Sequence, residues 1–556
     1  MNKKVCSFPI LFALLALLIG TCAVVFPASA QAAPTSTGSI TVSGTVASSY
    51  DAYQIFSANV VDGDSDAKIA TDLAWASDAV RDAALPVLHS AGMPKSQTTA
   101  QEAAEWLNAD SHLTSALSAQ LARSLQSSGA VSVALNAGTA AELPRGYWLI
   151  VAKDDAIAQG EAGTAPIMAL AGGSAVTVKP KAATPKVSKH VLEDGTAAWQ
   201  KAADATVADD LYWCLSATVP AGLAAYDTYT VQFVDTMSAG LDPSRVAASM
   251  HVYVAAGADG GFDAVQTSKD GRAGTEPAKG WTDITAQCAT KVAADGKTFT
   301  VRTGDLIAAL GGADAFTAGA RVVAVYNAPL NSTCNHGIAK GNPNEVYLRY
   351  PRSPFADQSG DAGFTRTPSD DACAYTWDLA LTKRGSDGDK PLAGAVLSIA
   401  DDRGRTLAAD GTWDAEGKAT VTTGEDGRVT VSGVDSGKLE VRELKAPKGY
   451  TAFEGMRSVT VKAEGLDVDQ VAAAKPKLTI TAESPLRADS ADGSTGSLEA
   501  SLINTPTGTP PSITTGGFMP STGDMAMYAA AAAAVAGAAL IVVALLVKRG
   551  GGSHKE

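Results

Sequence analysis

Two long stretches of the sequence contain short runs in which apolar and polar residues alternate with a period of two. They cover residues 187–350 and 374–505, and turns rich in Asp, Gly and Pro divide them into short runs. Successive side chains on a strand point to opposite faces, so this period predicts strands with one buried face. Short strands at this spacing are typical of all-β sandwiches.

The period changes between residues 66 and 127, inside an N-terminal region that otherwise contains strand-like runs. Thr99 and Glu102 have the spacing of a capping box. Four leucines follow Asp110 and Ser111 at intervals of four: Leu113, Leu117, Leu121 and Leu125. This spacing predicts helices inserted into a β-domain, with the leucines facing its core.

Both ends of the chain contain hydrophobic segments. Lys3 and Lys4 precede an apolar run over residues 8–26 and small residues at 28–30, the layout of a secretory signal peptide. Cleavage after Ala30 or Ala33 fits equally well. Near the C-terminus an uncharged run over residues 525–547 is long enough to cross a bilayer as a helix, and basic residues follow it. We therefore expect an exported protein with a C-terminal transmembrane helix.

Composition narrows the function classes. A net charge of −14 argues against nucleic acid as a partner. No Gly-x-Ser-x-Gly, zinc-type His pair or phosphate loop occurs, so we expect no cofactor, no metal and no enzyme that turns over a substrate. Two of the six cysteines lie in the signal peptide. The other four allow one or two disulfides in three connectivities: Cys214, Cys288, Cys334 and Cys373.

Composition also divides the chain into domains. Residues 179–185 are rich in Pro and Lys, and residues 354–371 are rich in Asp, Gly and Ser. The expected division is a signal peptide at 1–30, an N-terminal β-domain at 34–180, a middle domain at 181–353, a joint at 354–371, a third domain at 372–506, a linker at 507–517 and a C-terminal segment at 518–556.

A short motif stands just before the C-terminal helix. It consists of Met519, Pro520, Ser521, Thr522 and Gly523. Together with the helix and the basic tail, it resembles the cell-wall sorting signal of Gram-positive surface proteins, with Met519 where Leu is usual. The resemblance implies that a sortase cuts between Thr522 and Gly523 and joins the Thr carbonyl to an amine.

Two further stretches resemble motifs of sortase-assembled pilins. Residues 178–181 read Val-Lys-Pro-Lys and are similar to the pilin motif, whose lysine accepts the next subunit. Residues 439–450 are similar to the E-box of the family's Cna B-type domains, and the middle domain resembles a fimbrial isopeptide-forming Ig-like domain. The resemblance implies Lys181 as the acceptor. Because Lys179 and Ala182 depart from the motif, Lys179 and Lys186 remain alternatives.

Domains of this family carry an amide bond between a Lys and an Asn on neighbouring strands, promoted by a buried acid. The resemblance implies two bonds, Lys189–Asn344 and Lys383–Asn504, promoted by Asp235 and Glu443. These bonds require buried groups, because burial favours the neutral amine and the protonated acid. All six residues share the alternation of apolar neighbours on their strands, so they are expected to point inward.

No internal amide bond is expected at Lys181 or in the first domain. Lys181 has the opposite alternation and is expected to be exposed. The first domain is expected to lack such a bond, since Ala140 replaces the acid and no lysine of the mature chain precedes Lys68.

The resemblance implies the shaft subunit of a covalently polymerised pilus that serves adhesion at the cell wall. Its expected partners are sortase, identical subunits and peptidoglycan, and host surface ligands are left open. The alternatives are a monomeric wall-anchored adhesin and an ancillary pilin.

Overall fold

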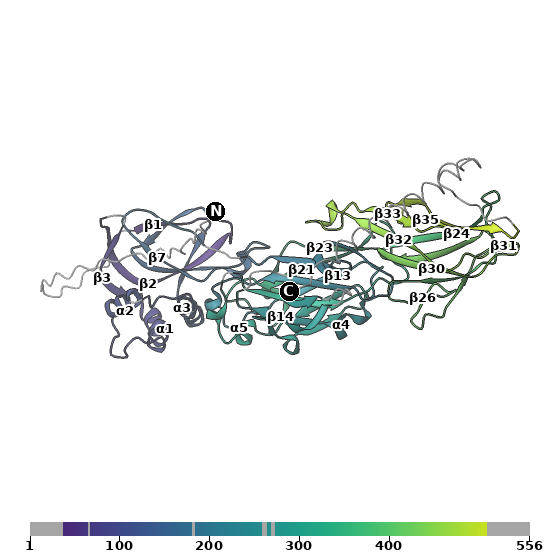
Figure 1. Cartoon of the computed structure of the whole chain (residues 1–556). Coiled ribbons are helices and arrows are strands. Elements are labelled where there is room, and N and C mark those ends of the chain that lie inside the picture. Colours follow the sequence, from purple (N-terminus) through teal and green to yellow (C-terminus); the bar gives the residue numbers. More distant parts are fainter. Residues whose placement is uncertain are drawn as a thin grey trace, which may run out of the picture.

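The computed structural model describes residues 37–508, except 65–66, 110, 181–183, 258–263, 268–272 and 318. It shows three β-rich bodies in a row (Figure 1). The signal peptide, the sorting motif and the expected span at 525–547 lie outside the described residues. Within the described part, no helix is both long and apolar enough to span a membrane.

The N-terminal body holds two sheets and three helices. Its elements are β1 Thr37–Val42, β2 Ser49–Asp62, β3 Lys68–Trp75, α1 Asp78–Ser90, α2 Ala100–Asn108, α3 Ser115–Ser128, β4 Ser132–Asn136, β5 Ala140–Pro144, β6 Gly146–Ala152, β7 Ile167–Ala171 and β8 Val176–Val178. One sheet has the order β5-β1-β8; the other has the order β3-β2-β6-β7, with β4 also paired to β2. The predicted helical insertion is therefore present between β3 and β4.

The helices largely follow the sequence pattern. Thr99 caps α2 in a complete capping box with Glu102, as predicted. Three of the four leucines are buried on α3, but Leu113 is 39% exposed. The helix begins later than predicted, because the Thr114 side chain accepts a hydrogen bond from the Leu117 backbone N–H and caps it there.

The middle body is a two-sheet sandwich. Its elements are β9 Val187–Glu193, β10 Ala198–Gln200, β11 Ala202–Asp204, β12 Tyr212–Thr218, β13 Gln232–Met237, α4 Val246–Ser249, β14 His251–Ala255, β15 Val265–Thr267, β16 Ala273–Pro277, β17 Thr282–Asp283, β18 Ala289–Val292, β19 Thr298–Arg302, α5 Leu306–Ala309, β20 Arg321–Asn327, β21 Asn342–Pro351, β22 Phe364–Arg366 and β23 Asp370–Tyr375. One sheet has the order β10-β9-β12-β20-β14-β17. The other has the order β11-β23-β21-β13-β19-β18, with β22 also paired to β21.

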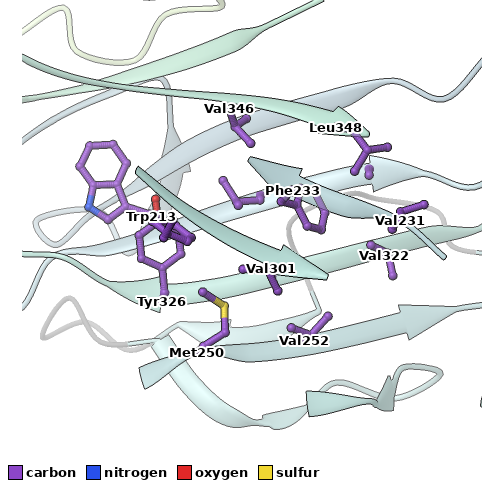
Figure 2. Close-up of a cluster of buried hydrophobic side chains, with 14 of the residues drawn as sticks. Trp213, Val231, Phe233, Met250, Val252, Val301, Val322, Tyr326, Val346 and Leu348 are labelled. Atoms are coloured by element: carbon purple, nitrogen blue, oxygen red, sulfur yellow. The ribbon is translucent and has the colours of Figure 1, made fainter. Parts of the chain in front are cut away.

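An apolar core fills the space between these sheets (Figure 2). Trp213 and Tyr326 contribute the largest rings drawn there, from the paired strands β12 and β20, and both are fully buried. The facing sheet and the residue just before it contribute four more core side chains, all 1% exposed or less: Val231, Phe233, Val346 and Leu348.

The C-terminal body is a second two-sheet sandwich. Its elements are β24 Trp377–Gly385, β25 Val396–Ala400, β26 Thr406–Leu407, β27 Trp413–Asp414, β28 Val421–Thr422, β29 Arg428–Val434, β30 Gly437–Lys445, β31 Tyr450–Thr451, β32 Met456–Glu464, β33 Lys477–Ala482, β34 Leu486–Asp492 and β35 Ser497–Pro506. One sheet has the order β29-β24-β35-β31, with β34 paired to β35; the other has the order β27-β26-β25-β30-β32-β33, with β28 paired to β25. The first and last strands, β24 and β35, pair in parallel.

The stretch expected to join the middle and third domains is largely built into the middle body. Strands β22 and β23 both pair with β21. Residues 372–375, expected at the start of the third domain, thus belong to a sheet of the middle body. Only Thr376, which is fully buried, separates β23 from β24. The two sandwiches are therefore joined by a nearly continuous run of strand.

Candidate functional site: two buried lysine–acid–asparagine clusters

The sequence predicts two trios of inward-pointing Lys, acid and Asn side chains, and the structure buries all six residues. Lys189, Asp235, Asn344 and Lys383 have no exposed surface, Asn504 is 2% exposed and Glu443 is 6% exposed. Charged side chains are rarely buried to this extent unless they are paired. The two groups are called the middle cluster and the C-terminal cluster below.

The C-terminal cluster lies at the ends of three strands. Lys383 on β24 and Asn504 on β35 lie diagonally on one face, because Lys383 is in register with Leu502 and Gly385 with Asn504. The Lys383 Nζ donates a hydrogen bond to Asn504 Oδ1. It also lies 3.0 Å from Oε1 of Glu443, which comes from β30 in the facing sheet.

Glu443 connects the amine to the amide group. Asn504 Nδ2 donates to both carboxylate oxygens of Glu443, at 2.9 and 3.1 Å. The backbone N–H of Phe453 donates to Oε2 at 3.1 Å. Burial lowers the pKa of Lys383 to about 8, although the Glu443 charge opposes that change. The amine that would attack the amide is thus easier to deprotonate than an ordinary lysine.

The middle cluster draws its side chains from both sheets. Asp235 on β13 and Asn344 on β21 come from adjacent antiparallel strands, with Asn344 opposite Met237. Lys189 on β9 comes from the facing sheet and contacts Asp235 Oδ2. The expectation that Lys and Asn occupy neighbouring, paired strands is therefore met in the C-terminal cluster but not in the middle one, where their strands belong to different sheets.

Burial dominates the electrostatics of the middle cluster. It lowers the pKa of Lys189, and the nearby Asp235 charge opposes this effect only in part. Burial also raises the pKa of Asp235, against the opposing effect of Lys189. Both shifts favour transfer of the proton from amine to carboxylate. Asp235 Oδ1 and Asn344 Oδ1 are buried and find no hydrogen-bond partner among the described residues.

Tyr326, which the sequence pattern does not single out, completes the middle cluster. Its hydroxyl accepts hydrogen bonds from Lys189 Nζ and from Asn344 Nδ2, both at 2.8 Å, and donates one to Asp235 Oδ2 at 3.1 Å. An inward-facing tyrosine on a strand has the same pattern as any aromatic core residue. Only the three-dimensional arrangement shows its position.

A second ion pair holds the backbone of Lys189. The backbone N–H of Lys189 donates a hydrogen bond to Asp370 Oδ2 at 2.6 Å, and the Lys189 carbonyl accepts one from Lys201 Nζ at 2.8 Å. Strand β10 pairs with β9 only as far as Val191, so the backbone of Lys189 lies just beyond the end of this pairing. Asp370 and Lys201, which also contact each other, supply the partners that β10 does not.

The remaining predicted residues fall into two groups. Lys181, Met519, Pro520, Ser521, Thr522 and Gly523 lie outside the described residues. The alternative acceptors Lys179 and Lys186 are both exposed. In the N-terminal body, Lys68 is buried, and its amine donates to the Gly172 and Ser174 carbonyls, both at 2.6 Å. The four described cysteines are free thiols, and no metal-binding group of residues occurs in the described part.

Part of the C-terminal body matches the model of a known protein family. Residues 378–475 match the family model SpaA, a prealbumin-like fold domain. The chain is also similar to the trypsin-resistant surface T6 protein of Streptococcus pyogenes serotype M6, with 31% identity over 134 residues. That match spans 23% of this chain and 23% of the relative.

The structural comparison also finds solved structures of pilins. The T6 backbone pilin of serotype M6 Streptococcus pyogenes has a TM-score of 0.47 and 17% identity, over 85% of this chain and 99% of that one. The major pilin SpaD from Corynebacterium diphtheriae has a TM-score of 0.40 and 16% identity, over 86% and 100%. These homologues and structural neighbours are major or backbone pilins of Gram-positive bacteria.

Proposed function

We propose that this protein is the shaft subunit of a covalently polymerised pilus on a Gram-positive cell surface. Sortase would cut after Thr522 and join its carbonyl to Lys181 of the next subunit, and finally to the cell wall. Internal amide bonds, Lys189–Asn344 and Lys383–Asn504, would stabilise each subunit. The single observation that carries the proposal is the pair of buried clusters, each holding a lysine amine beside an acid and an asparagine amide.

The chemistry of each bond follows from the contacts. In each cluster the lysine gives one proton to the acid that it contacts and becomes a neutral nucleophile. In the C-terminal cluster the acid also accepts hydrogen bonds from the asparagine amide group and can polarise it. Nζ then bonds to the amide carbon, the bond from that carbon to Nδ2 breaks, and ammonia leaves. A buried ion pair without such a reaction contributes little net stability, because desolvation offsets the attraction of the charges. Two such pairs beside asparagines are better explained by bond formation.

The pKa of Lys383 predicts how the rate of bond formation depends on pH. The reactive state, neutral Lys383 with protonated Glu443, holds the same single proton as the ion pair, so its population is constant while that proton stays bound. Because the folded pKa of Lys383 is about 8, the pair loses its proton as pH rises through 8. We expect the rate for this bond to fall as pH rises above 8, measured by crosslinked-peptide mass in newly synthesised full chain. A rate that keeps rising past pH 9 would contradict this assignment.

Polymerisation is tested on cell-wall extracts boiled in detergent and reductant and immunoblotted for this protein. The unmodified strain is expected to show a ladder of high-mass bands, and a Lys181→Ala strain only the monomer, because the acceptor amine is gone. Lys179→Ala and Lys186→Ala strains are the matched controls and should keep the ladder. Loss of the ladder in one of these strains instead would move the acceptor to that residue. A single band in every strain would support a monomeric wall-anchored adhesin.

A further inference from the structure

The hydroxyl of Tyr326 lies between the groups that must exchange protons in the middle cluster. It is 2.8 Å from Lys189 Nζ, the attacking atom, and 2.8 Å from Asn344 Nδ2, the departing atom. It also donates to Asp235 Oδ2 at 3.1 Å. A group within hydrogen-bond distance of both the attacking and the leaving nitrogen satisfies the geometric requirement for a general acid–base catalyst.

The two clusters differ in the group that contacts both the lysine nitrogen and the amide nitrogen. In the C-terminal cluster, Glu443 contacts both nitrogens, since Asn504 Nδ2 donates to each of its oxygens and Lys383 Nζ lies 3.0 Å from Oε1. In the middle cluster, Asn344 Nδ2 donates to Tyr326. Aspartate is one methylene shorter than glutamate, and the phenol occupies the position between acid and amide. The single carboxylate of one site corresponds to a carboxylate and a phenol in the other.

We propose that Tyr326 is a catalytic residue of the middle cluster, relaying a proton from the Lys189 amine to the departing nitrogen of Asn344. This inference rests on the proposed Lys189–Asn344 bond. It assigns to Tyr326 the second proton transfer of the reaction, and leaves the first to Asp235.

The relay balances as follows. Lys189 gives its first proton to Asp235, whose Oδ2 then no longer needs the phenol as a donor. After Nζ attacks the amide carbon, Nζ carries one excess proton. Tyr326 takes that proton while giving its own to Nδ2, the bond to Nδ2 breaks, and ammonia leaves. Tyr326 ends as a neutral phenol, Asp235 ends protonated, and the net charge of the site is zero before and after.

The surroundings of Tyr326 suit this role. Burial raises its pKa well above the ordinary value, so the phenol keeps a proton to give. Trp213 lies opposite it in register (Figure 2). Phe299 packs edge-on against it, with 4.8 Å between the ring centroids. The ring is therefore held by apolar contacts that do not involve its hydroxyl, and a Phe in its place should pack similarly.

The test is a time course of bond formation in full-length chain made by cell-free synthesis. Samples are quenched at intervals and digested, and the two crosslinked peptides are quantified by mass spectrometry. In Tyr326→Phe, the Lys189–Asn344 crosslink is expected to form about a hundredfold or more slowly, the usual size of a general acid–base contribution. The Lys383–Asn504 crosslink in the same molecules should form at the unmodified rate.

Matched controls separate the possible results. Tyr253→Phe removes another fully buried ring's hydroxyl, which donates to the Thr275 carbonyl, and should leave both rates unchanged. An unmodified rate in Tyr326→Phe would overturn the relay. Absence of the middle crosslink from the unmodified protein would instead refute the proposed bond. If protease resistance shows that Tyr326→Phe does not fold, 3-fluorotyrosine at position 326 keeps the ring and changes its acidity. An unaltered rate in that variant would also overturn the relay.

Discussion

Asn504→Ala is expected to raise the mass of the chain by one ammonia beyond the substitution itself, and to lower the free energy of unfolding of the C-terminal body by about 5 kcal/mol. Lys383 and Asn504 are 121 positions apart, and closing a loop of that length restricts the unfolded chain about as strongly as a disulfide would. The variant keeps the ion pair between Lys383 and Glu443, so it removes the acceptor without leaving a buried charge alone. The measurements are intact mass under denaturing and reducing conditions, and unfolding by denaturant.

Asn342→Ala is the matched control for this experiment. Asn342 is also fully buried, and its side chain donates to the Asn335 and Ala374 carbonyls. Asn342→Ala should lower the free energy of unfolding because those hydrogen bonds are lost. Its mass should still be two ammonia molecules below the mass calculated from its sequence, because both internal bonds form. If the unmodified protein has the full mass of its sequence, neither internal bond exists.

Asp235→Asn should prevent the middle bond from forming and destabilise the middle body strongly. Without the acid, Lys189 has no acceptor for its first proton. Its charge also loses its carboxylate partner in a site with no exposed surface. Removing one member of a buried ion pair typically costs about 3–5 kcal/mol, and the loss of the crosslink adds to that. Crosslink mapping and denaturant unfolding of the full chain provide the two measurements.

Glu345→Gln is the matched control, because Glu345 follows Asn344 on β21 but is exposed. It should leave both the mass and the stability nearly unchanged. The C-terminal crosslink should persist in Asp235→Asn, since Glu443 serves that site. An intact Lys189–Asn344 crosslink in Asp235→Asn would show that another group takes the proton.

The sequence was sufficient to place the six cluster residues on buried faces. Strand alternation is a local rule, so the apolar neighbours of Lys383 or Asn344 reveal which way each side chain points. It could not place Lys189 in a different sheet from Asn344, because pairing between strands far apart in sequence leaves no local signal. Tyr326 was missed for a related reason, since an inward tyrosine is an ordinary core residue until its hydroxyl is seen among polar groups.

The boundary between the middle and C-terminal bodies could not be predicted from local sequence pattern either. The Asp/Gly/Ser-rich composition before residue 371 predicts a joint, yet β22 and β23 extend the middle sheet through pairing with β21. The support of Lys189 by Asp370 and Lys201 depends on this arrangement. Those two residues lie far apart in the sequence, and neither belongs to a motif.

The positions of the four bonding residues determine how the molecule would respond to tension. Lys189 lies on the first strand of the middle body, and Asn504 lies on the last strand of the C-terminal body. With both bonds formed, a pull applied between the start of β9 and the end of β35 passes from Lys189 to Asn344. It then follows the backbone through β23 and β24 to Lys383, and crosses to Asn504. Residues 190–343 and 384–503 bear none of this force, so the strands within those ranges would stay folded. Only residues 345–382, which include β22 and β23, would carry the load between the two bonds.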